Sequence, residues 1–347
     1  MTIETRALRD RDDALRLQDL VYSAYGLTYH RSFLYEPDHL LELNRAGQIR
    51  SVIALVDGEV VGHMATIRPW FELLPPERAA EPATAVEIGL SIVHPDHRGR
   101  RLQTAIGLAC LMEERAANPE LRTMFAKCLT SHTRSQRSAR GMLGRSCALL
   151  LGSVPAWVVH DRTRRPSPMT TIVVQSPCSD APRDLPVPAA HEDLMRTLLD
   201  GSPLVRRLQL VPRGAAALSG TTSLTRWFEP ARRRGVVHVW DAGADLIERV
   251  LESVAWFSGG HMEHVTVLVP LGDPAVAAAI PVLEEAGLFF GGFLPDLEDR
   301  DVAVLEWLDT ELIDIGAIEV EGDESAVLRD AVVTGWQRTR EGIVRAG

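Results

Sequence analysis

The sequence predicts an α/β protein with a mixed β-sheet, divided into two domains. At 347 residues the chain is longer than one ordinary domain. Strand-like and helix-like segments alternate along it, and the second half partly repeats the plan of the first. A tandem of two α/β domains with the same topology is therefore expected.

In the first half, segments with apolar periodicity fall in the order β-α-α-β-β-β-α-β-α. The clearest local signal is the Asp57-Gly58 pair between two apolar runs, which predicts a hairpin. The other expected elements are a short strand from residue 2, helices at 12–25 and 37–47, a strand at 85–95, a helix at 104–118, a strand at 121–132 and a helix at 134–144.

The second half is expected to follow a linker. Residues 161–190 are rich in Pro and Ser around one strand-like run, "TTIVVQ", which predicts a crossover strand plus linker. Three strands and two helices are predicted beyond it, at 233–243, 244–260, 264–271, 273–287 and 302–309. The predicted domains are thus 1–160 and 191–347.

Composition limits the functions to consider. A net charge of −10 disfavours general nucleic-acid binding, which needs surplus cations. The sequence has no apolar run of membrane-spanning length, and its charged N-terminus lacks a signal-peptide core. The four cysteines are scattered, which predicts core residues of a cytoplasmic protein and no metal site. The arginine runs at 162–165 and 232–234 are expected to be solvated loop charges.

A basic turn carries the strongest functional signal. The segment "VEIGLSIVHPDHRGRRLQTAIGLACLMEE" predicts a strand, a turn with Arg98 and Gly99, and an amphipathic helix. A helix N-terminus presents backbone N–H groups and a positive dipole end, which suit a phosphate. Gly99 allows close backbone approach, and Arg98, Arg100 and Arg101 add guanidinium donors. The turn is a candidate diphosphate site, and a solvated basic loop is the alternative.

This segment resembles motif A of the GNAT superfamily of acyl-CoA-dependent acyltransferases, whose pattern is often written V-x-P-x-x-R-G-x-G. Val93, Pro95, Arg98 and Gly99 are in register with it, whereas Arg101 stands where the family prefers Gly or Ala. Asp96 also departs from the Gln or Arg that the family prefers. The resemblance extends over residues 1–155.

The second half resembles the same fold more weakly. Its corresponding turn, "VWDAGADLIERV", has no Arg-Gly step and carries Asp241 and Asp245, which would repel a diphosphate. The expected architecture is therefore two tandem GNAT-like domains, of which the C-terminal one is degenerate and lacks a CoA site.

The resemblance implies an activity and its binding residues. It implies transfer of an acyl group from acetyl-CoA or another acyl-CoA to an amine of a small metabolite, by direct attack in a ternary complex. It also makes a homodimer possible and is consistent with a bacterial enzyme. The implied acyl-CoA-binding residues lie on the strand end, the turn and the helix start: Leu90, Ser91, Ile92, Val93, Arg98, Gly99, Arg100, Arg101, Leu102 and Gln103.

Two residues are candidates for proton transfer. A carboxylate on the strand before the turn often serves as the base in this family, and Glu87 is the candidate here. A salt-bridged structural Glu is the alternative. The family often places a tyrosine after the next strand as the leaving-group acid, but this chain has His132 there. A helix-capping residue is the alternative for His132. The T-x-H-x-x-x-Q stretch that contains it loosely resembles a sub-group of tandem GNAT-like proteins.

All four tyrosines of the chain lie in "VYSAYGLTYHRSFLYEP", residues 21–37. In the GNAT fold this region lies over the acceptor side of the site, so the resemblance implies one wall of the acceptor pocket. Tyr29 and Tyr35 are the preferred candidates for substrate binding, followed by Tyr25 and His30. Packing against the core is the alternative for Tyr22 and Tyr25.

Other functions remain open at this level. The acyl donor could be a carrier protein or an aminoacyl-tRNA, although the acidic balance disfavours tRNA. Arg101 in place of a small residue favours a different class, a non-catalytic protein that senses CoA or another ligand.

Overall fold

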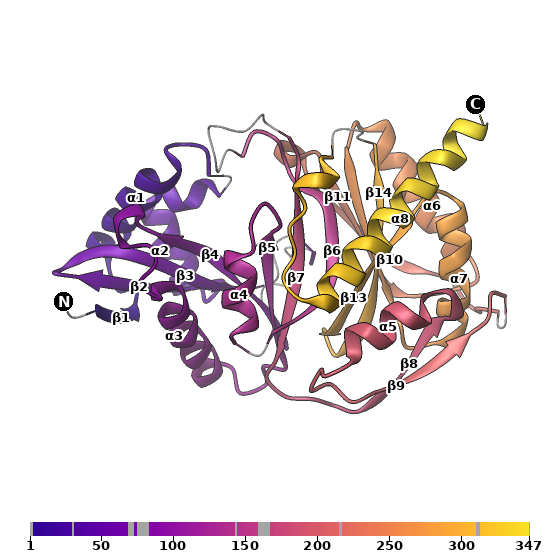
Figure 1. Cartoon of the computed structure of the whole chain (residues 1–347), viewed down its shortest axis with the longest axis horizontal. Coiled ribbons are helices and arrows are strands. Elements are labelled where there is room, and N and C mark those ends of the chain that lie inside the picture. Colours follow the sequence, from indigo (N-terminus) through magenta and orange to yellow (C-terminus); the bar gives the residue numbers. More distant parts are fainter. Residues whose placement is uncertain are drawn as a thin grey trace.

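The computed structural model describes residues 3–29, 31–68, 73–74, 83–142, 144–158, 167–214, 217–309 and 313–346. Over these residues the chain forms a twelve-stranded mixed sheet in the order β1-β2-β3-β4-β5-β7-β6-β13-β14-β12-β11-β10. A separate pair, β8 and β9, completes the strands of the described part. The first seven strands of this order come from the N-terminal half of the chain and the other five from the C-terminal half (Figure 1).

The N-terminal half contains the predicted elements. Asp57 and Gly58 both have positive φ, as the tight turn between β2 and β3 requires. The strands are β1 (Ile3–Ala7), β2 (Ile49–Val56), β3 (Glu59–Ile67), β4 (Ala85–Val93), β5 (Thr123–Leu129), β6 (Arg145–Val154) and β7 (Met169–Pro177). The helices are α1 (Arg11–Tyr25), α2 (Pro37–Arg45), α3 (Leu102–Ala117) and α4 (Arg134–Arg140).

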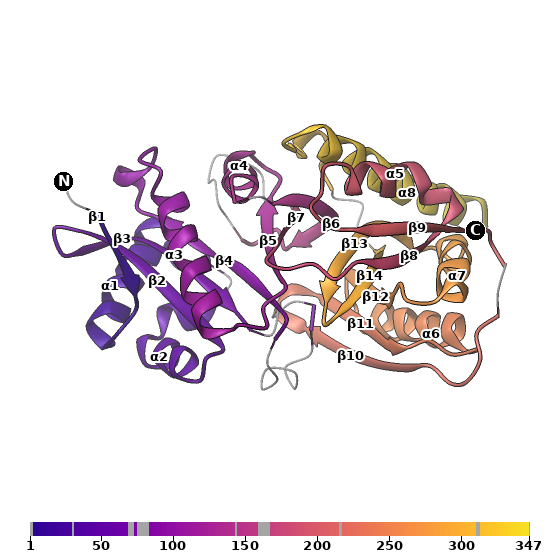
Figure 2. The ribbon, with the colours of Figure 1, turned by 90° about the horizontal axis from the view of Figure 1, so that it is seen from below.

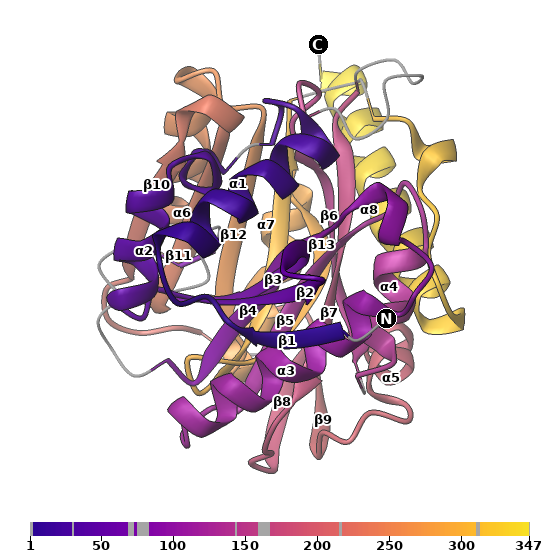
Figure 3. The ribbon, with the colours of Figure 1, turned by 90° about the vertical axis from the view of Figure 1, so that its left-hand side faces the viewer.

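Helices cover the two faces of this first part of the sheet. α1 and α2 pack on one face through a core that includes Leu17, Leu40, Ile53 and Leu90. α3 packs on the other face, where Ile106 contacts the position of Gly62 so closely that a Cβ there would lie 2.6 Å from the Ile106 side chain. Figure 3, which looks onto this half, shows α1 and α3 on opposite sides of the strands.

The C-terminal half repeats the strand order. Five neighbouring strands of this half have the same order in the sheet, and the same relative directions, as five strands of the first half. These are β10-β11-β12-β14-β13, which correspond to β3-β4-β5-β7-β6. The helix between the two parallel strands is α3 in the first half and α6 in the second. The strands are β10 (Ser223–Glu229), β11 (Arg234–Asp241), β12 (His264–Pro270), β13 (Phe289–Leu297) and β14 (Arg300–Leu308), with helices α6 (Leu246–Gly259) and α7 (Pro274–Glu285).

The remaining elements cover the second half of the sheet. α5 (Glu192–Leu199) and α8 (Asp323–Ala346) lie on one face, and α6 and α7 lie on the other (Figure 2). β8 (Arg183–Pro188) and β9 (Arg206–Val211) form their parallel pair beside α7. The sequence reasoning missed β6, β8, β9, β10, β13, α5 and α8.

The two halves meet where β6 lies antiparallel to β13. The contact requires Gly292, because a Cβ there would lie 2.3 Å from the carbonyl oxygen of Cys147. β6 and β13 hold equivalent places in the two halves, so their antiparallel contact relates the halves by an approximate two-fold rotation. The expected crossover strand within 161–190 is β7, and it lies inside the sheet between β5 and β6. The division at 160 and 190 stays a prediction.

Candidate active site

The strands β4 and β5 separate halfway along their length. They pair in parallel only at Ala85–Thr123, Val86–Met124 and Glu87–Phe125, although β4 continues to Val93 and β5 to Leu129. Figure 1 shows the two ribbons diverging beyond this point. The backbone of residues 88–93 thus faces a split in the sheet beside α3.

A bulge shapes the β4 side of this split. The β3–β4 register shifts between His63–Ile92 and Ala65–Gly89, and Leu90 has a φ of +53°. The Leu90 carbonyl lies 2.9 Å from the Nδ1 atom of buried His63. Burial lowers the pKa of His63 to about 4, so the ring is neutral near pH 7 and Nδ1 can donate its proton to this carbonyl. Ser91, Ile92 and Val93 complete the strand beyond the bulge.

The turn from β4 to α3 is open. Arg98, Gly99, Arg100 and Arg101 are exposed, and a Cβ added at Gly99 would meet no atom within 4 Å. Arg101 is the last residue before α3 and has a φ of +57°, a left-handed conformation that favours glycine. Its exposed side chain does not fill the turn. Leu102 is buried under the helix start, and Gln103 is half-buried.

The corresponding turn in the second half is covered. A Cβ at Gly243, three residues before α6 as Gly99 is before α3, would lie 2.4 Å from the carbonyl carbon of Thr221. The Asp245 side chain at the start of α6 accepts a hydrogen bond from the Thr222 amide at 2.7 Å. β11 and β12 also stay paired from Arg234–His264 to His238–Leu268. In the described part of this half the helix start is therefore covered, and the parallel strands stay paired over five positions instead of the three of β4 and β5.

Glu87 lies at the point where β4 and β5 part. It is 7 % exposed, and its Oε1 lies 3.8 Å from the Nζ of Lys127 on β5. Burial, followed by the neighbouring arginines 234, 232 and 31, lowers the pKa of Lys127 well below its ordinary value. Sequence reasoning did not identify Lys127, although its alternation with Phe125 on β5 places it on the face of Glu87.

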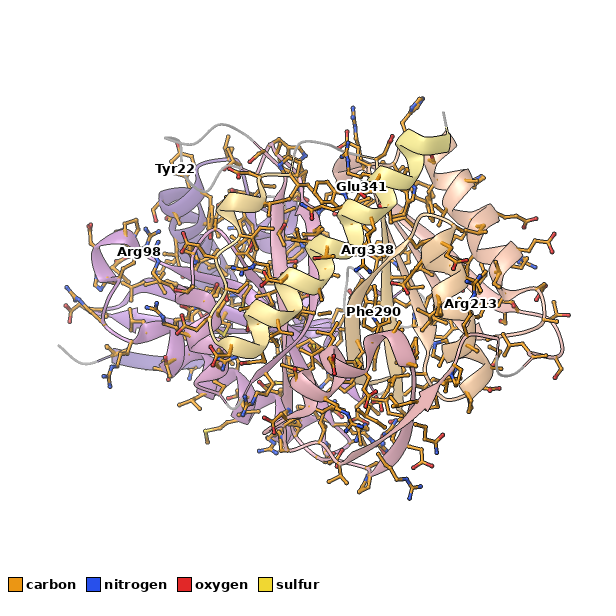
Figure 4. All side chains as sticks on the ribbon, turned by 45° about the vertical axis from the view of Figure 1, so that its right-hand side comes forward. Tyr22, Arg98, Arg213, Phe290, Arg338 and Glu341 are labelled. Carbon is orange, nitrogen blue, oxygen red and sulfur yellow. The ribbon has the colours of Figure 1, made fainter. Side chains whose placement is uncertain are left out.

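The tyrosines divide between roles. Tyr22 is 61 % exposed and lies on the surface of the N-terminal half (Figure 4). The rings of Tyr25 and Tyr29 lie 4.7 Å apart, centre to centre. Burial raises the pKa of both, so each keeps its phenolic proton, and Tyr29 interacts electrostatically with Arg31 and Glu87. Tyr25 and Tyr29 also pack against the core under α1 and α2, and a substrate contact for either of them stays a prediction.

Tyr35 instead holds the loop. Its hydroxyl donates to the Gly26 carbonyl at 2.8 Å and accepts from the Tyr29 amide at 3.2 Å. A substrate contact for Tyr35 stays a prediction. His30 lies outside the described residues.

His132 follows β5 and is half-buried. Its carbonyl accepts from the Gln136 side chain at 3.2 Å, and the same amide nitrogen donates to the Glu319 carbonyl at 2.8 Å. The Gln136 oxygen in turn accepts from the Glu321 amide. Gln136 of the T-x-H-x-x-x-Q stretch thus holds the segment before α8 against the first half. A catalytic role for His132 stays a prediction.

The arginine run 232–234 was expected to be solvated, and this was wrong for two of its members. Arg232 is 6 % exposed and Arg234 is 2 % exposed, whereas the Arg233 side chain is 63 % exposed. Arg232 donates to the Ser153 carbonyl at 2.7 Å and lies 3.4 Å from Glu229. Glu229 also lies 3.8 Å from Arg31, the neighbour of the tyrosines. Residues of the second half therefore reach the Glu87 region. Arginine run 162–165 lies outside the described residues.

Among the described residues no group of three His, Cys, Asp or Glu is placed to hold a metal ion. In the described part of the chain no helix is both long and apolar enough to cross a membrane. Figure 4 shows Arg98 on the N-terminal half, at the end of the molecule away from Arg213.

Residues 15–142 match the family model of the GNAT acetyltransferases, described as "Acetyltransferase (GNAT) family". No curated protein matches the chain. Similar solved structures include an N-acetyltransferase from Staphylococcus aureus Mu50, with 14 % identity, a TM-score of 0.40, and coverage of 50 % of this chain and 98 % of that one.

Two others are yncA from Salmonella typhimurium, whose structure is described with its cofactor acetyl-CoA, and the ribosomal-protein-S18-alanine N-acetyltransferase from Escherichia coli. The first has 16 % identity and a TM-score of 0.38, and the match covers 50 % of this chain and 93 % of that one. The second has 11 % identity and a TM-score of 0.38, and the match covers 52 % of this chain and 96 % of that one. The family assignment rests on the sequence match. The chain therefore contains a GNAT acetyltransferase domain at residues 15–142.

Proposed function

We propose that this protein transfers an acetyl or other acyl group from acyl-CoA to an amine of a small metabolite, by direct attack in a ternary complex. The observation that carries the proposal is the split between β4 and β5 beside the open α3 turn, with Glu87 where the strands part. A diphosphate fits at the α3 turn, and an extended thioester arm fits along the β4 backbone.

The residues have separate roles in this proposal. The amides and guanidinium groups from Arg98 to Gln103 bind the diphosphate. The strand after the Leu90 bulge orients the thioester carbonyl and offers it a backbone N–H. Glu87 accepts a proton from the acceptor ammonium, directly or through water, and the amine then attacks the thioester carbon.

The reaction balances without another reagent. The new C–N bond forms, the C–S bond breaks, and the CoA thiolate takes a proton as it leaves. His132, which follows β5, is the preferred donor of this proton, because an imidazole can give up a proton near neutral pH. Tyr29 is the alternative, although burial raises its pKa and thereby makes it a weaker acid. The products are an amide and CoA with a free thiol.

A small acceptor is favoured by the burial of the groups around Glu87. Lys127, Arg31 and Arg232 have side chains that are 7 %, 11 % and 2 % exposed. These three side chains come from both halves of the chain and are largely closed off from solvent, so a compact substrate is favoured over a large one.

Two measurements test the function. Calorimetric titration with acetyl-CoA is expected to show binding, and no binding at millimolar concentration would overturn the proposal. Thiol release is then followed with a panel of small amines and with a peptide bearing a free N-terminus. Turnover of small amines supports the proposal, whereas turnover of the peptide alone would assign a protein acceptor. Binding without any turnover would identify a CoA-sensing protein.

A further inference from the structure

β10 forms one border of the twelve-stranded sheet. In the described part of the chain β11 is its one partner, and the two strands are antiparallel. Figure 2 shows β10 at the border of the second half, with α6 beside it. The strand contains neither proline nor lysine, the residues that often protect such an edge. Alternate backbone groups of an edge strand point away from the sheet, so β10 is an edge that can accept another strand.

The first half shows what lies beside the corresponding strand. β3 corresponds to β10, and its outer edge is paired with the antiparallel strand β2. Val52, Ala54 and Val56 of β2 pack in one core with Ile106 of α3. In the described part of the second half no strand takes the place of β2. A strand added to β10 would therefore turn its alternate side chains towards α6, the counterpart of α3.

A pocket of about 540 Å³ lies between β10 and the C-terminal end of α6. Phe228 of β10 is 46 % exposed and Trp256 of α6 is 52 % exposed, and their ring centres lie 5.9 Å apart. The pocket is lined by these two rings, by Phe257 and Met262, and by the turn at Gly259 and Gly260. Exposed aromatic rings around a pocket of this size are typical of a surface that binds an apolar side chain.

Arg226 adds a requirement of charge. It lies two residues before Phe228, so both side chains are on the face of β10 that is turned to α6. The guanidinium carbon of Arg226 lies 5.1 Å from the centre of the Trp256 ring. Arg226 is exposed and takes part in no ion pair within the described part of the chain. An acidic side chain directly opposite Arg226 on an added strand would be attracted to it.

We propose that β10 binds an extended segment of a partner protein as an additional strand, with an apolar residue in the pocket and an acidic residue two positions away, opposite Arg226. Backbone hydrogen bonds to the edge give affinity for an extended chain, and the pocket and Arg226 select its sequence. This surface is separate from the proposed acyl transfer and does not depend on it.

A second copy of this chain matches the surface less well. The side chains of β10 on the face of α6 are Leu224, Arg226 and Phe228, and none of them is acidic. Antiparallel pairing of two copies of β10 therefore gives Arg226 no carboxylate directly opposite it.

The test selects phage-displayed random nonapeptides on the wild-type protein. The enriched peptides are expected to share an apolar and an acidic residue two positions apart. Synthetic peptides should bind the wild type in fluorescence anisotropy and slow the hydrogen exchange of residues 223–229. W256A should weaken this binding by about 10-fold to 100-fold. The proposal would be overturned if no peptide were enriched, or if W256A bound the enriched peptides as tightly as the wild type does.

M112A is the matched control. Met112 is 72 % exposed and lies ten residues after the first residue of α3, as Trp256 does in α6. M112A should bind the peptides as the wild type does, and an equal loss in M112A and W256A would count against the pocket.

A charge exchange tests the contact with Arg226, and it decides if W256A fails to fold. R226E should weaken binding of the acidic peptides by about tenfold. Replacing the acidic residue of the peptide by lysine should restore binding to R226E, and failure of this rescue would remove Arg226 from the site.

Two further measurements test the strand pairing and the kind of partner. N-methylation of the peptide removes backbone donors, so it should abolish binding at alternate positions; equal tolerance at every position would exclude an added strand. Sedimentation of the wild type and F228E tests the second copy. A wild-type dimer that F228E dissociates would assign the edge to a second copy and overturn the proposal, whereas a monomer would support a free edge.

Discussion

The Nδ1 atom of His63 lies 2.9 Å from the carbonyl oxygen of Leu90 and links β3 to the bulge of β4. His63 is completely buried, and burial lowers its pKa to about 4 from the ordinary value of 6.5. The folded state therefore holds the neutral ring across a pH range in which the unfolded chain takes up a proton.

This linkage predicts a pH-dependent stability. The contribution of His63 is fully present above pH 6.5 and is lost as the pH falls from 6.5 towards 4. The loss is about 2 to 3 kcal/mol of the free energy of unfolding. H63Q, which keeps an N–H donor but does not titrate, should show a smaller difference between pH 7 and 4.5 in urea unfolding. H39Q, at an exposed position, should keep the wild-type difference. An equal difference in the free energy of unfolding for the wild type and H63Q would contradict this account.

E87Q should slow turnover if Glu87 accepts the proton of the amine. At pH 7 a decrease in kcat of about 100-fold is expected. The decrease should be smaller at high pH, where the amine loses its proton to solvent. The measurement is a pH–rate profile, with E113Q on the exposed face of α3 as the control. A profile for E87Q that parallels that of the wild type would remove Glu87 from this role.

Two equivalent glycines should respond differently to alanine. In G99A the new Cβ meets nothing, so the cost is about 1 kcal/mol of backbone strain, because φ is +79°. The KM for acetyl-CoA should rise about tenfold, because the added Cβ hinders the close approach of a phosphate to the backbone amides of the turn. In G243A the Cβ meets backbone, so stability should fall by about 1 to 3 kcal/mol.

G243A should leave the KM for acetyl-CoA unchanged. Kinetics and thermal unfolding of both variants check the pair. A larger effect of G243A than of G99A on that KM would show that the second half binds CoA.

Q136A should loosen the segment before α8. The variant loses side-chain hydrogen bonds to Leu129, Glu319 and Glu321, with an expected cost of about 1 to 3 kcal/mol. Faster hydrogen exchange over residues 319–325 should accompany this loss. S138A is the control, because the Ser138 hydroxyl makes no hydrogen bond within the described part of the chain. Unchanged exchange in Q136A would mean that other contacts hold this segment.

Much of the fold follows from local patterns. The β2–β3 hairpin is encoded by Asp57-Gly58, and the β4 turn and α3 by apolar alternation followed by helical spacing. β13 was missed because its sequence "FFGGFLPDL" contains Gly291 and Gly292, which normally weaken a strand. Here Gly292 is required by the approach of β6, a contact between distant parts of the chain.

The candidate site, too, could be predicted only where its signals are local in the sequence. Glu87 and the α3 turn could be found because their signals lie within one strand and one turn. The burial of Arg232 and Arg234 depends on how the second half packs against the first, which no local pattern reports. A run of three arginines is typical of a loop, and the structure shows that only the middle one follows that expectation.

The approximate two-fold relation at β6 and β13 has a consequence for how such a molecule can change. In a symmetric dimer of identical chains, every substitution appears in both copies. With both copies encoded in a single gene product, one helix start can be sealed while the other stays accessible. A substitution that covers the helix start of one half therefore leaves the helix start of the other half unchanged.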